Sequence, residues 1–151
     1  MRSKITLDIT PLTNVRATQG DKVFFRIPRE QLRPAGLKRL LRLEKYNDYK
    51  VSLLAEAKRN RFICPEQGAE VVFYLPVPKS WSNRKKKEKH LKLHSGKPDL
   101  DNMLKAFFDG LFTEDHHIGS IMVTKLWIND IKGKIEITFN AGIYGSKDTL
   151  V

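Results

Sequence analysis

The chain lacks the features that mark secreted and membrane proteins. One cysteine, Cys64, stands in 151 residues, so no intramolecular disulfide can form, as is usual in a reducing compartment. The N-terminus MRSKITLDIT is too polar for a signal peptide. The apolar run GAEVVFYLPVP is far shorter than the roughly 20 residues that cross a bilayer. The sequence therefore predicts a cytoplasmic protein that does not span a membrane.

Several catalytic motifs are missing as well. The sequence has no glycine-rich phosphate loop and no nucleophilic Ser or Cys arrangement. His90 and His94 have helical spacing, but no second pair of Cys or His ligands accompanies them, which disfavours zinc. Acidic residues are the minority, because 17 Asp and Glu face 28 Lys and Arg for a net charge of +11. Such a charge favours nucleic acid as the partner, with anionic lipid as a weaker alternative.

The length and the hydrophobic pattern predict a single domain over residues 1–151 with an α+β (α/β) fold, in which helices pack on a small mixed β-sheet. Apolar residues at three- and four-residue steps indicate helices, and short runs rich in Val, Ile and aromatic residues indicate strands. Residues 1–21 are an extra strand or an arm. The expected elements are a strand at 22–28, a helix at 35–62, a strand at 68–78, a mobile basic loop at 79–97, a helix at 98–110 that ends at Gly110, and two strands at 120–129 and 133–141 that form a hairpin.

The segment KPDLDNMLKAFFDGL carries the first group of chemically interesting residues. Pro98 favours a helix start, which puts Asp99 at the N-cap and Asp101 in the first turn. Lys105 follows four residues after Asp101 on the same side. On its own this pattern has a purely structural interpretation, namely a capped helix with an Asp to Lys pair.

Asp115 adds a third carboxylate, because it lies in the turn between this helix and the next strand. If Asp99, Asp101 and Asp115 converge, their like charges need a neutralising cation, and hard oxygen ligands prefer Mg²⁺ or Mn²⁺. An acidic cluster on a strongly basic protein indicates metal-dependent cleavage of a phosphodiester. Lys105 would then neutralise charge on the phosphate. Asp109, two turns along the helix, is expected to form a helix-end salt bridge or a turn contact rather than to bind the metal.

The motif KPDLDNMLKAFFDGLFTED resembles that of the RusA-like Holliday junction resolvases (crossover junction endodeoxyribonucleases) of phages and prophages. The similarity covers about residues 22–140, and includes LPVPKSWS before the Lys-rich segment and the ITFN ending. It implies a Mg²⁺-dependent homodimer that binds four-way DNA junctions in a bacterial or phage-infected cell and makes paired, symmetric nicks. It also implies that Asp99, Asp101 and Asp115 bind the metal and that Lys105 is needed for cleavage. The sequence departs from the family at IPREQLRPAG and in having Glu114 before Asp115.

The basic segment before the motif supplies the candidate DNA contacts. Lys and Arg at this density favour phosphate binding, and the candidates are Arg84, Lys85, Lys86, Lys87, Lys89 and Lys97. Trp81 and Trp127 are expected to pack rather than to stack on bases. His116 and His117 directly follow Asp115, and a structural role is expected for them. Two alternatives stay open: a flap or branched-DNA nuclease with the same site, and a non-catalytic basic nucleic-acid-binding protein.

Overall fold

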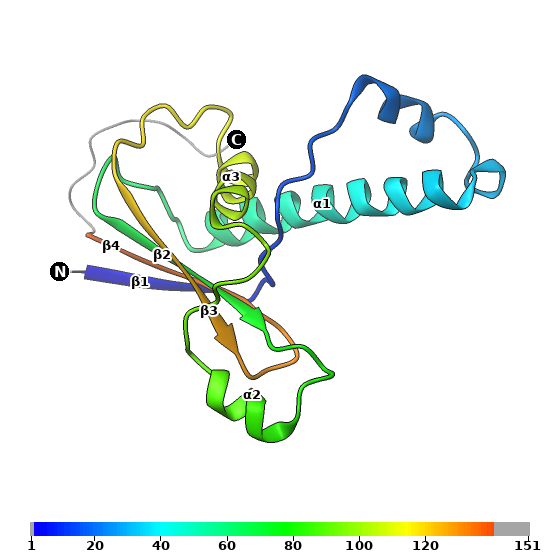
Figure 1. The fold of residues 1–151 in the computed structure, drawn as a ribbon. Coiled ribbons are helices and arrows are strands. Elements are labelled where there is room, and N and C mark those ends of the chain that lie inside the picture. Colours follow the sequence, from blue (N-terminus) through cyan, green and yellow to red (C-terminus); the bar gives the residue numbers. More distant parts are fainter. Residues whose placement is uncertain (1, 141–151) are drawn as a thin grey trace.

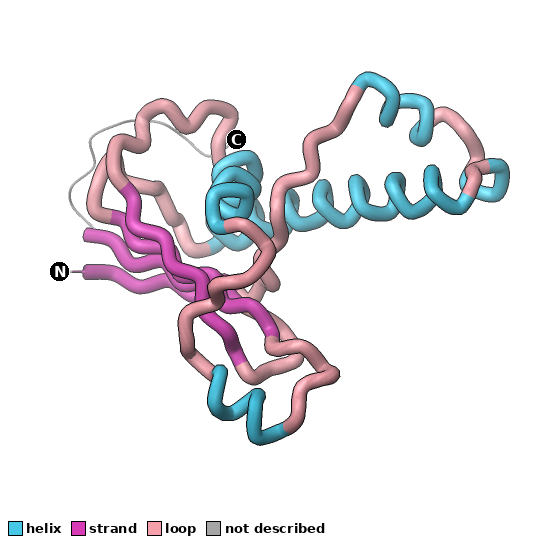
Figure 2. The backbone as a smooth tube through the Cα atoms, viewed as in Figure 1, coloured by secondary structure: helices cyan, strands magenta, loops and turns pink. Residues whose placement is uncertain are grey.

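A four-stranded mixed sheet forms the centre of the protein. The computed structural model describes residues 2–140. The strands are β1 (Arg2–Leu7), β2 (Ala69–Pro76), β3 (Ile121–Ile128) and β4 (Lys134–Asn140), in the spatial order β1-β4-β2-β3. β2 is parallel to β3 and antiparallel to β4, and β1 is antiparallel to β4. Figures 1 and 2 show this sheet with helices packed on it, which confirms the predicted α+β fold.

The predicted hairpin is wrong. β3 and β4 follow each other in the chain, but β2 lies between them in the sheet. β2 is the most apolar strand and is buried over most of its length, so a central position with partners on both edges satisfies it best. The five residues between β3 and β4 are long enough, at about 3.3 Å each, to pass the width of one strand. Residue 141, at the end of the predicted second strand, lies outside the described residues.

Two helices cover one face of the sheet, α1 (Pro34–Arg59) and α3 (Leu100–Leu111). α1 begins with Pro34 at its first turn, as the missing N–H of proline allows. It runs unbroken past Asn47 and projects beyond the sheet (Figure 1). Its buried residues recur at three- and four-residue steps, as predicted; they are Leu40, Leu43, Tyr46, Tyr49, Leu53 and Ala57.

The core lies between the sheet and α3. Phe73 of β2 and Phe107 of α3 are fully buried and meet edge to face, with ring centroids 5.9 Å apart. Gly110 does not end α3, which continues to Leu111. A Cβ at Gly110 would lie 2.9 Å from Leu53 Cδ1 and 3.4 Å from Lys50 Cα. The glycine is therefore needed for the close approach of α3 to α1 rather than for a helix end.

The strand predicted at 22–28 is a 3₁₀ helix, η1 (Gln19–Phe25). The edge of the sheet beside β4 is already occupied by β1, and Val23 and Phe25 are left 49% and 56% exposed. The segment is fastened to α1 by Arg39, whose Nε and Nη2 donate to the Asp21 carboxylate at 3.0 and 2.9 Å. This guanidinium holds the pKa of Asp21 below its usual range. A second short 3₁₀ helix, η2 (Arg29–Gln31), follows.

The basic segment predicted as a loop contains a helix, α2 (Asn83–Lys89). Ser82 starts it, because its Oγ accepts a hydrogen bond from the Lys85 amide at 3.2 Å. Beyond α2 the chain lies along the free edge of β3. The amide of Leu91 donates to the Trp127 carbonyl at 2.9 Å, and the Trp127 amide donates to the Lys92 carbonyl at 3.0 Å. Docking to the sheet edge thus orders a segment that like-charge repulsion alone would keep extended.

Within residues 2–140 no helix combines the length and the apolar character needed to cross a bilayer.

We expect Gly133→Ala to destabilise the protein. A Cβ at this buried position would lie 2.2 Å from the Tyr74 carbonyl oxygen and 3.0 Å from Pro11 Cδ, so the backbone of β2 or β4 must move. Overpacking of this kind costs about 1–3 kcal/mol, which urea unfolding measures. Gly20→Ala is the control, since its Cβ would meet Thr18 Oγ1 at an ordinary 3.7 Å and should change stability by less than about 0.5 kcal/mol. Equal stability of the two variants would contradict the packing of β4 on β2.

Candidate active site

The solvent face of α3 carries a row of charged side chains. Asp101, Lys105 and Asp109 follow one another at four-residue steps and are exposed, whereas Met103 and Phe107 between them are fully buried. Residues four apart lie one turn apart on the same face of a helix. The burial of one face of α3 on the sheet therefore presents the other face, with its charges, to solvent.

Asp99 stands at the N-cap of α3, as predicted, but does not act as a cap. Its backbone is extended, with φ −70° and ψ 137°, and its side chain makes no capping hydrogen bond. The exposed carboxylate lies at the positive end of the helix dipole, where a negative charge is favourable. Helix capping therefore does not explain the presence of Asp99. The oxygens of its carboxylate are available for another ligand.

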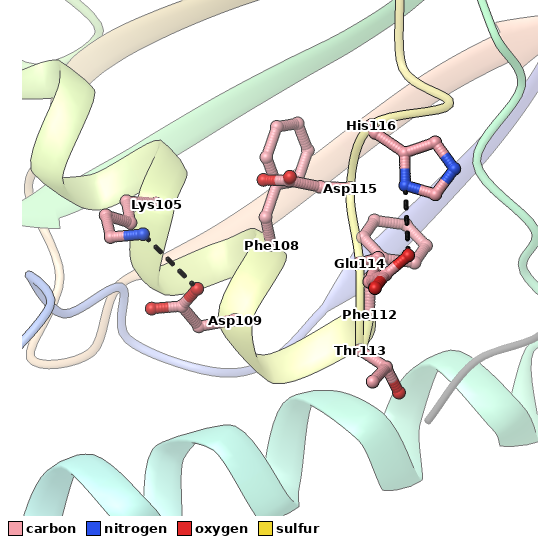
Figure 3. A pocket seen from close by; sticks show the side chains of 8 residues that line it. All are labelled: Lys105, Phe108, Asp109, Phe112, Thr113, Glu114, Asp115 and His116. Carbon is pink, nitrogen blue, oxygen red and sulfur yellow. Dashed lines mark ion pairs between the residues drawn. The ribbon is translucent and has the colours of Figure 1, made fainter.

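A hollow of about 460 Å³ opens beside the C-terminal half of α3 (Figure 3). It lies between the helix and the turn that follows it. Two predicted site residues line it together, Lys105 and Asp115, along with Asp109 and Glu114. His116 Nδ1 lies 3.2 Å from Glu114 Oε2. The hollow thus combines three carboxylates with one lysine and one histidine at the surface.

A second hollow of about 620 Å³ lies on the other side of Lys105 and Asp109, toward α1 and residues 14–17. The Tyr46 hydroxyl donates to Asp109 Oδ2 at 3.2 Å, and burial raises the pKa of this phenol. Lys105 Nζ lies 3.7 Å from Asp109 Oδ1. Asp109 therefore ties α3 to α1 and pairs with Lys105, which confirms the expected ion pair.

The three predicted metal-binding aspartates are not gathered in one place. Asp99 and Asp101 lie at the start of α3, whereas Asp115 lines the hollow near its end. Among residues 2–140 no group of three His, Cys, Asp or Glu side chains is placed to hold a metal ion. The carboxylate oxygens are the donors that Mg²⁺ prefers, but their arrangement here does not fit a ready metal site, and the metal remains a prediction.

The candidate DNA contacts lie mainly on α2. Arg84, Lys85, Lys87 and Lys89 are exposed there, and Lys86 is half-buried. Lys85 Nζ lies 4.2 Å from the centre of the Trp81 ring, a cation–π contact that fixes one face of the helix. Lys97, the sixth candidate, is exposed two residues before Asp99. The chain therefore runs from a basic helix through residues 90–98 to the first aspartate.

Comparison with known proteins assigns the chain to a protein family. The family model of endodeoxyribonuclease RusA matches residues 27–139. The chain belongs to the RusA family. An uncharacterised protein of Bacillus subtilis (strain 168), YqaN, is 32% identical over 102 residues, which are 62% of this chain and 72% of that protein. RusA proteins are endodeoxyribonucleases that act on branched DNA junctions. The matched range includes α2, all of α3 and the turn that carries Asp115.

The histidines of this RusA protein have structural contacts. His90 Nδ1 accepts a hydrogen bond from the Asn129 amide at 2.9 Å, and the His94 ring stacks on Trp127 with centroids 3.7 Å apart. His90 and His94, which have the spacing of a zinc-binding pair, thus contact Asn129 and Trp127. His117 meets Phe112 edge to face at 5.0 Å. Trp81 and Trp127 pack on each other at 4.9 Å, as expected.

One residue near the RusA motif escapes sequence reasoning, namely Lys125. It lies in β3, is 9% exposed and hydrogen-bonds to the segment just before Asp99. The pattern contains a signal for it, because Val123, Lys125 and Trp127 alternate on one face of the strand. A lysine on the face that turns toward the core needs partners for its ammonium group.

Proposed function

We propose that this RusA-family protein resolves four-way DNA junctions by paired, symmetric nicks, as part of DNA recombination and repair. The observation that carries the proposal is the exposed row of charges that begins at the N-cap of α3, in which Asp99 and Asp101 precede Lys105 and follow the basic helix α2. Carboxylates repel the phosphates that α2 attracts. A protein that only bound DNA would gain nothing from that row, whereas a nuclease needs it.

We assign Lys105 to the phosphate of the DNA strand that is cut. Its side chain is 61% exposed, and its ion pair with Asp109 is long at 3.7 Å. An exposed pair of this kind is worth only about 0–1 kcal/mol, so a phosphate can replace the carboxylate. From that position the ammonium can stabilise the negative charge that develops on the phosphate during hydrolysis.

Asp99, Asp101 and Asp115 are proposed as the catalytic carboxylates, with Mg²⁺ or Mn²⁺ as their cofactor. Such an ion would lower the pKa of a water molecule and stabilise the leaving oxygen. The donor chemistry supports the proposal, although residues 2–140 contain no group of three such side chains already placed to hold a metal ion.

A homodimer is proposed because a four-way junction has near two-fold symmetry, and two opposed nicks suit two identical sites. Light scattering with and without junction DNA measures this directly. We expect a protein mass of twice the 17.5 kDa of one chain. A mass of one chain under both conditions would contradict the proposal.

The main alternative activity is cleavage of flaps or other branched DNA by the same residues. A panel of labelled four-way junction, flap and linear duplex separates them by which substrate is cut fastest.

We expect Asp101→Asn to abolish cleavage and preserve binding. The change removes one carboxylate charge at the start of α3 without altering α2, so single-turnover cleavage of a four-way junction should fall by on the order of 100-fold or more. Affinity should be equal or slightly higher, because a repulsive charge is removed. Asp48→Asn, an exposed aspartate of α1, is the matched control and should cleave normally. Wild-type nicking by Asp101→Asn in Mg²⁺ would exclude Asp101 from the site.

We expect the triple change of Lys85, Lys86 and Lys87 to Gln to weaken binding to junction and linear DNA alike. For each phosphate that the variant no longer neutralises, the slope of log affinity against log salt should fall by about 0.9. The cut position should not move, because these lysines are assigned to phosphates and not to bases. The control replaces three exposed lysines elsewhere, Lys45, Lys58 and Lys132. A larger effect in the control than in the α2 variant would place the DNA surface away from α2.

A further inference from the structure

Lys125 occupies a place where the fold calls for an apolar side chain. The strand register pairs it with Phe73 on β2, and Phe73 is fully buried against Phe107 of α3. Paired residues of neighbouring strands lie on the same face of a sheet. The side chain of Lys125 therefore enters the edge of the layer between the sheet and α3, and the residue is only 9% exposed.

The ammonium group of Lys125 is bound by the backbone just before α3. Its Nζ donates to the carbonyl of Gly96 and, at 2.5 Å, to the carbonyl of Pro98. A buried charge without such partners is strongly unfavourable. An apolar residue would fill the same space without that requirement, so the two hydrogen bonds are what a lysine adds at this position.

Further contacts hold the same segment to β3. The His94 amide donates to the Lys125 carbonyl at 2.9 Å, and the Gly96 amide donates to His94 Nδ1 at 3.2 Å. His94 is 5% exposed, and burial together with the nearby charge of Lys125 lowers its pKa. The lowered pKa favours the neutral ring, in which Nδ1 accepts the hydrogen bond from the Gly96 amide. Residues 94–98 and Lys125 form one unit, which we call the Lys125 clamp.

The clamp ends at the first candidate catalytic residue. The Pro98 carbonyl belongs to the peptide bond that leads into Asp99, and Asp99 is the residue from which α3 starts. Fixing that peptide fixes the direction in which Asp99 and, within the first turn of the helix, Asp101 leave the backbone. Asp99 makes no capping hydrogen bond of its own, so the clamp supplies an anchor that the cap does not.

We propose that Lys125 is a positioning residue for DNA cleavage, because its buried ammonium holds the backbone that presents Asp99 and Asp101. The proposal rests on the proposed function of these two aspartates. Lys125 is buried and is not itself a DNA contact. Its replacement should therefore slow the cleavage step without weakening the binding of DNA.

Lys125→Met and Lys125→Arg test the proposal against a role in packing alone. Methionine keeps an unbranched apolar stem of similar length and loses the donors, whereas arginine keeps charge and donors in a bulkier group. If the donors matter, Met should cleave a junction about 10- to 100-fold more slowly in single turnover, the range that small displacements of catalytic groups produce. Arg should stay closer to wild type. If only packing matters, the order reverses.

Junction affinity and hydrogen exchange complete the experiment. For Lys125→Met we expect a Kd within about twofold of wild type and faster amide exchange confined to residues 94–101, since released backbone groups exchange more readily. Lys132→Met, which removes an exposed lysine, is the charge control and should change neither quantity. A Lys125→Met protein that cleaves at the wild-type rate, or exchange unchanged at residues 94–101, would overturn the proposal.

A second variant decides the matter if Lys125→Met does not fold. His94→Phe keeps an aromatic ring on Trp127 and removes the acceptor for the Gly96 amide. It should show the same separation of slower cleavage from unchanged binding, and a wild-type cleavage rate would overturn the proposal. The exchange measurement needs no activity. If the wild-type protein cleaves no DNA, the proposed function fails, and the exchange data still show whether the clamp exists.

Discussion

The edge-to-face contact of Phe107 with Phe73 holds α3 on the sheet, and the placement of the candidate site follows from it. Once Phe107 and Met103 are buried, the helical period turns Asp101, Lys105 and Asp109 to solvent. The parallel pairing of β2 with β3 is part of the same constraint, because α2 and α3 form the connection between these strands. One crossover connection between two neighbouring strands thus contains the basic helix α2, Asp99, Asp101 and Lys105.

Electrostatics gives this arrangement its chemical meaning. A chain with a net charge of +11 attracts DNA over much of its surface, and local acidic groups oppose that attraction. Asp99 is exposed, makes no capping bond, and follows a backbone segment fastened by Lys125. The carboxylate of Asp99 lies next to a basic surface, where it weakens the attraction of DNA. Its presence there is better explained by a role in cleaving the DNA backbone than by a role in binding it.

The sequence predicted those elements whose pattern is periodic and local. In α1, α3 and β2 the type and spacing of the apolar residues match the burial of each element, so the local pattern was enough to predict them. The prediction of a hairpin was wrong because strands compete for partners in a sheet. The apolar strand β2 is stabilised more by burial at a central position than β3 or β4 would be. The prediction of a strand at 22–28 was wrong for a related reason. β1 occupies the edge of the sheet beside β4, and the Asp21–Arg39 ion pair holds the segment as a 3₁₀ helix on α1.

The site was predictable in residue type more than in geometry. The spacing of Asp99, Asp101 and Lys105 on one helix follows from the sequence, whereas the position of Asp115 depends on the turn after α3, which has no period. Lys125 was missed because its partners are backbone carbonyls 27 and 29 residues away. Tertiary hydrogen bonds of this kind leave no mark on the local pattern beyond a charged residue on the face that turns toward the core.

Cleavage by the wild-type protein of a four-way junction, labelled in turn on each strand, tests the central claim most directly. The reaction is compared with linear duplex and flap DNA of the same arm sequences, with Mg²⁺ and with chelator. We expect nicks at symmetric positions in two opposed strands of the junction, much slower cutting of linear duplex, and no cutting in chelator. Tight binding of the junction without any nick in Mg²⁺ would contradict the proposed nuclease activity and would leave a basic DNA-binding protein.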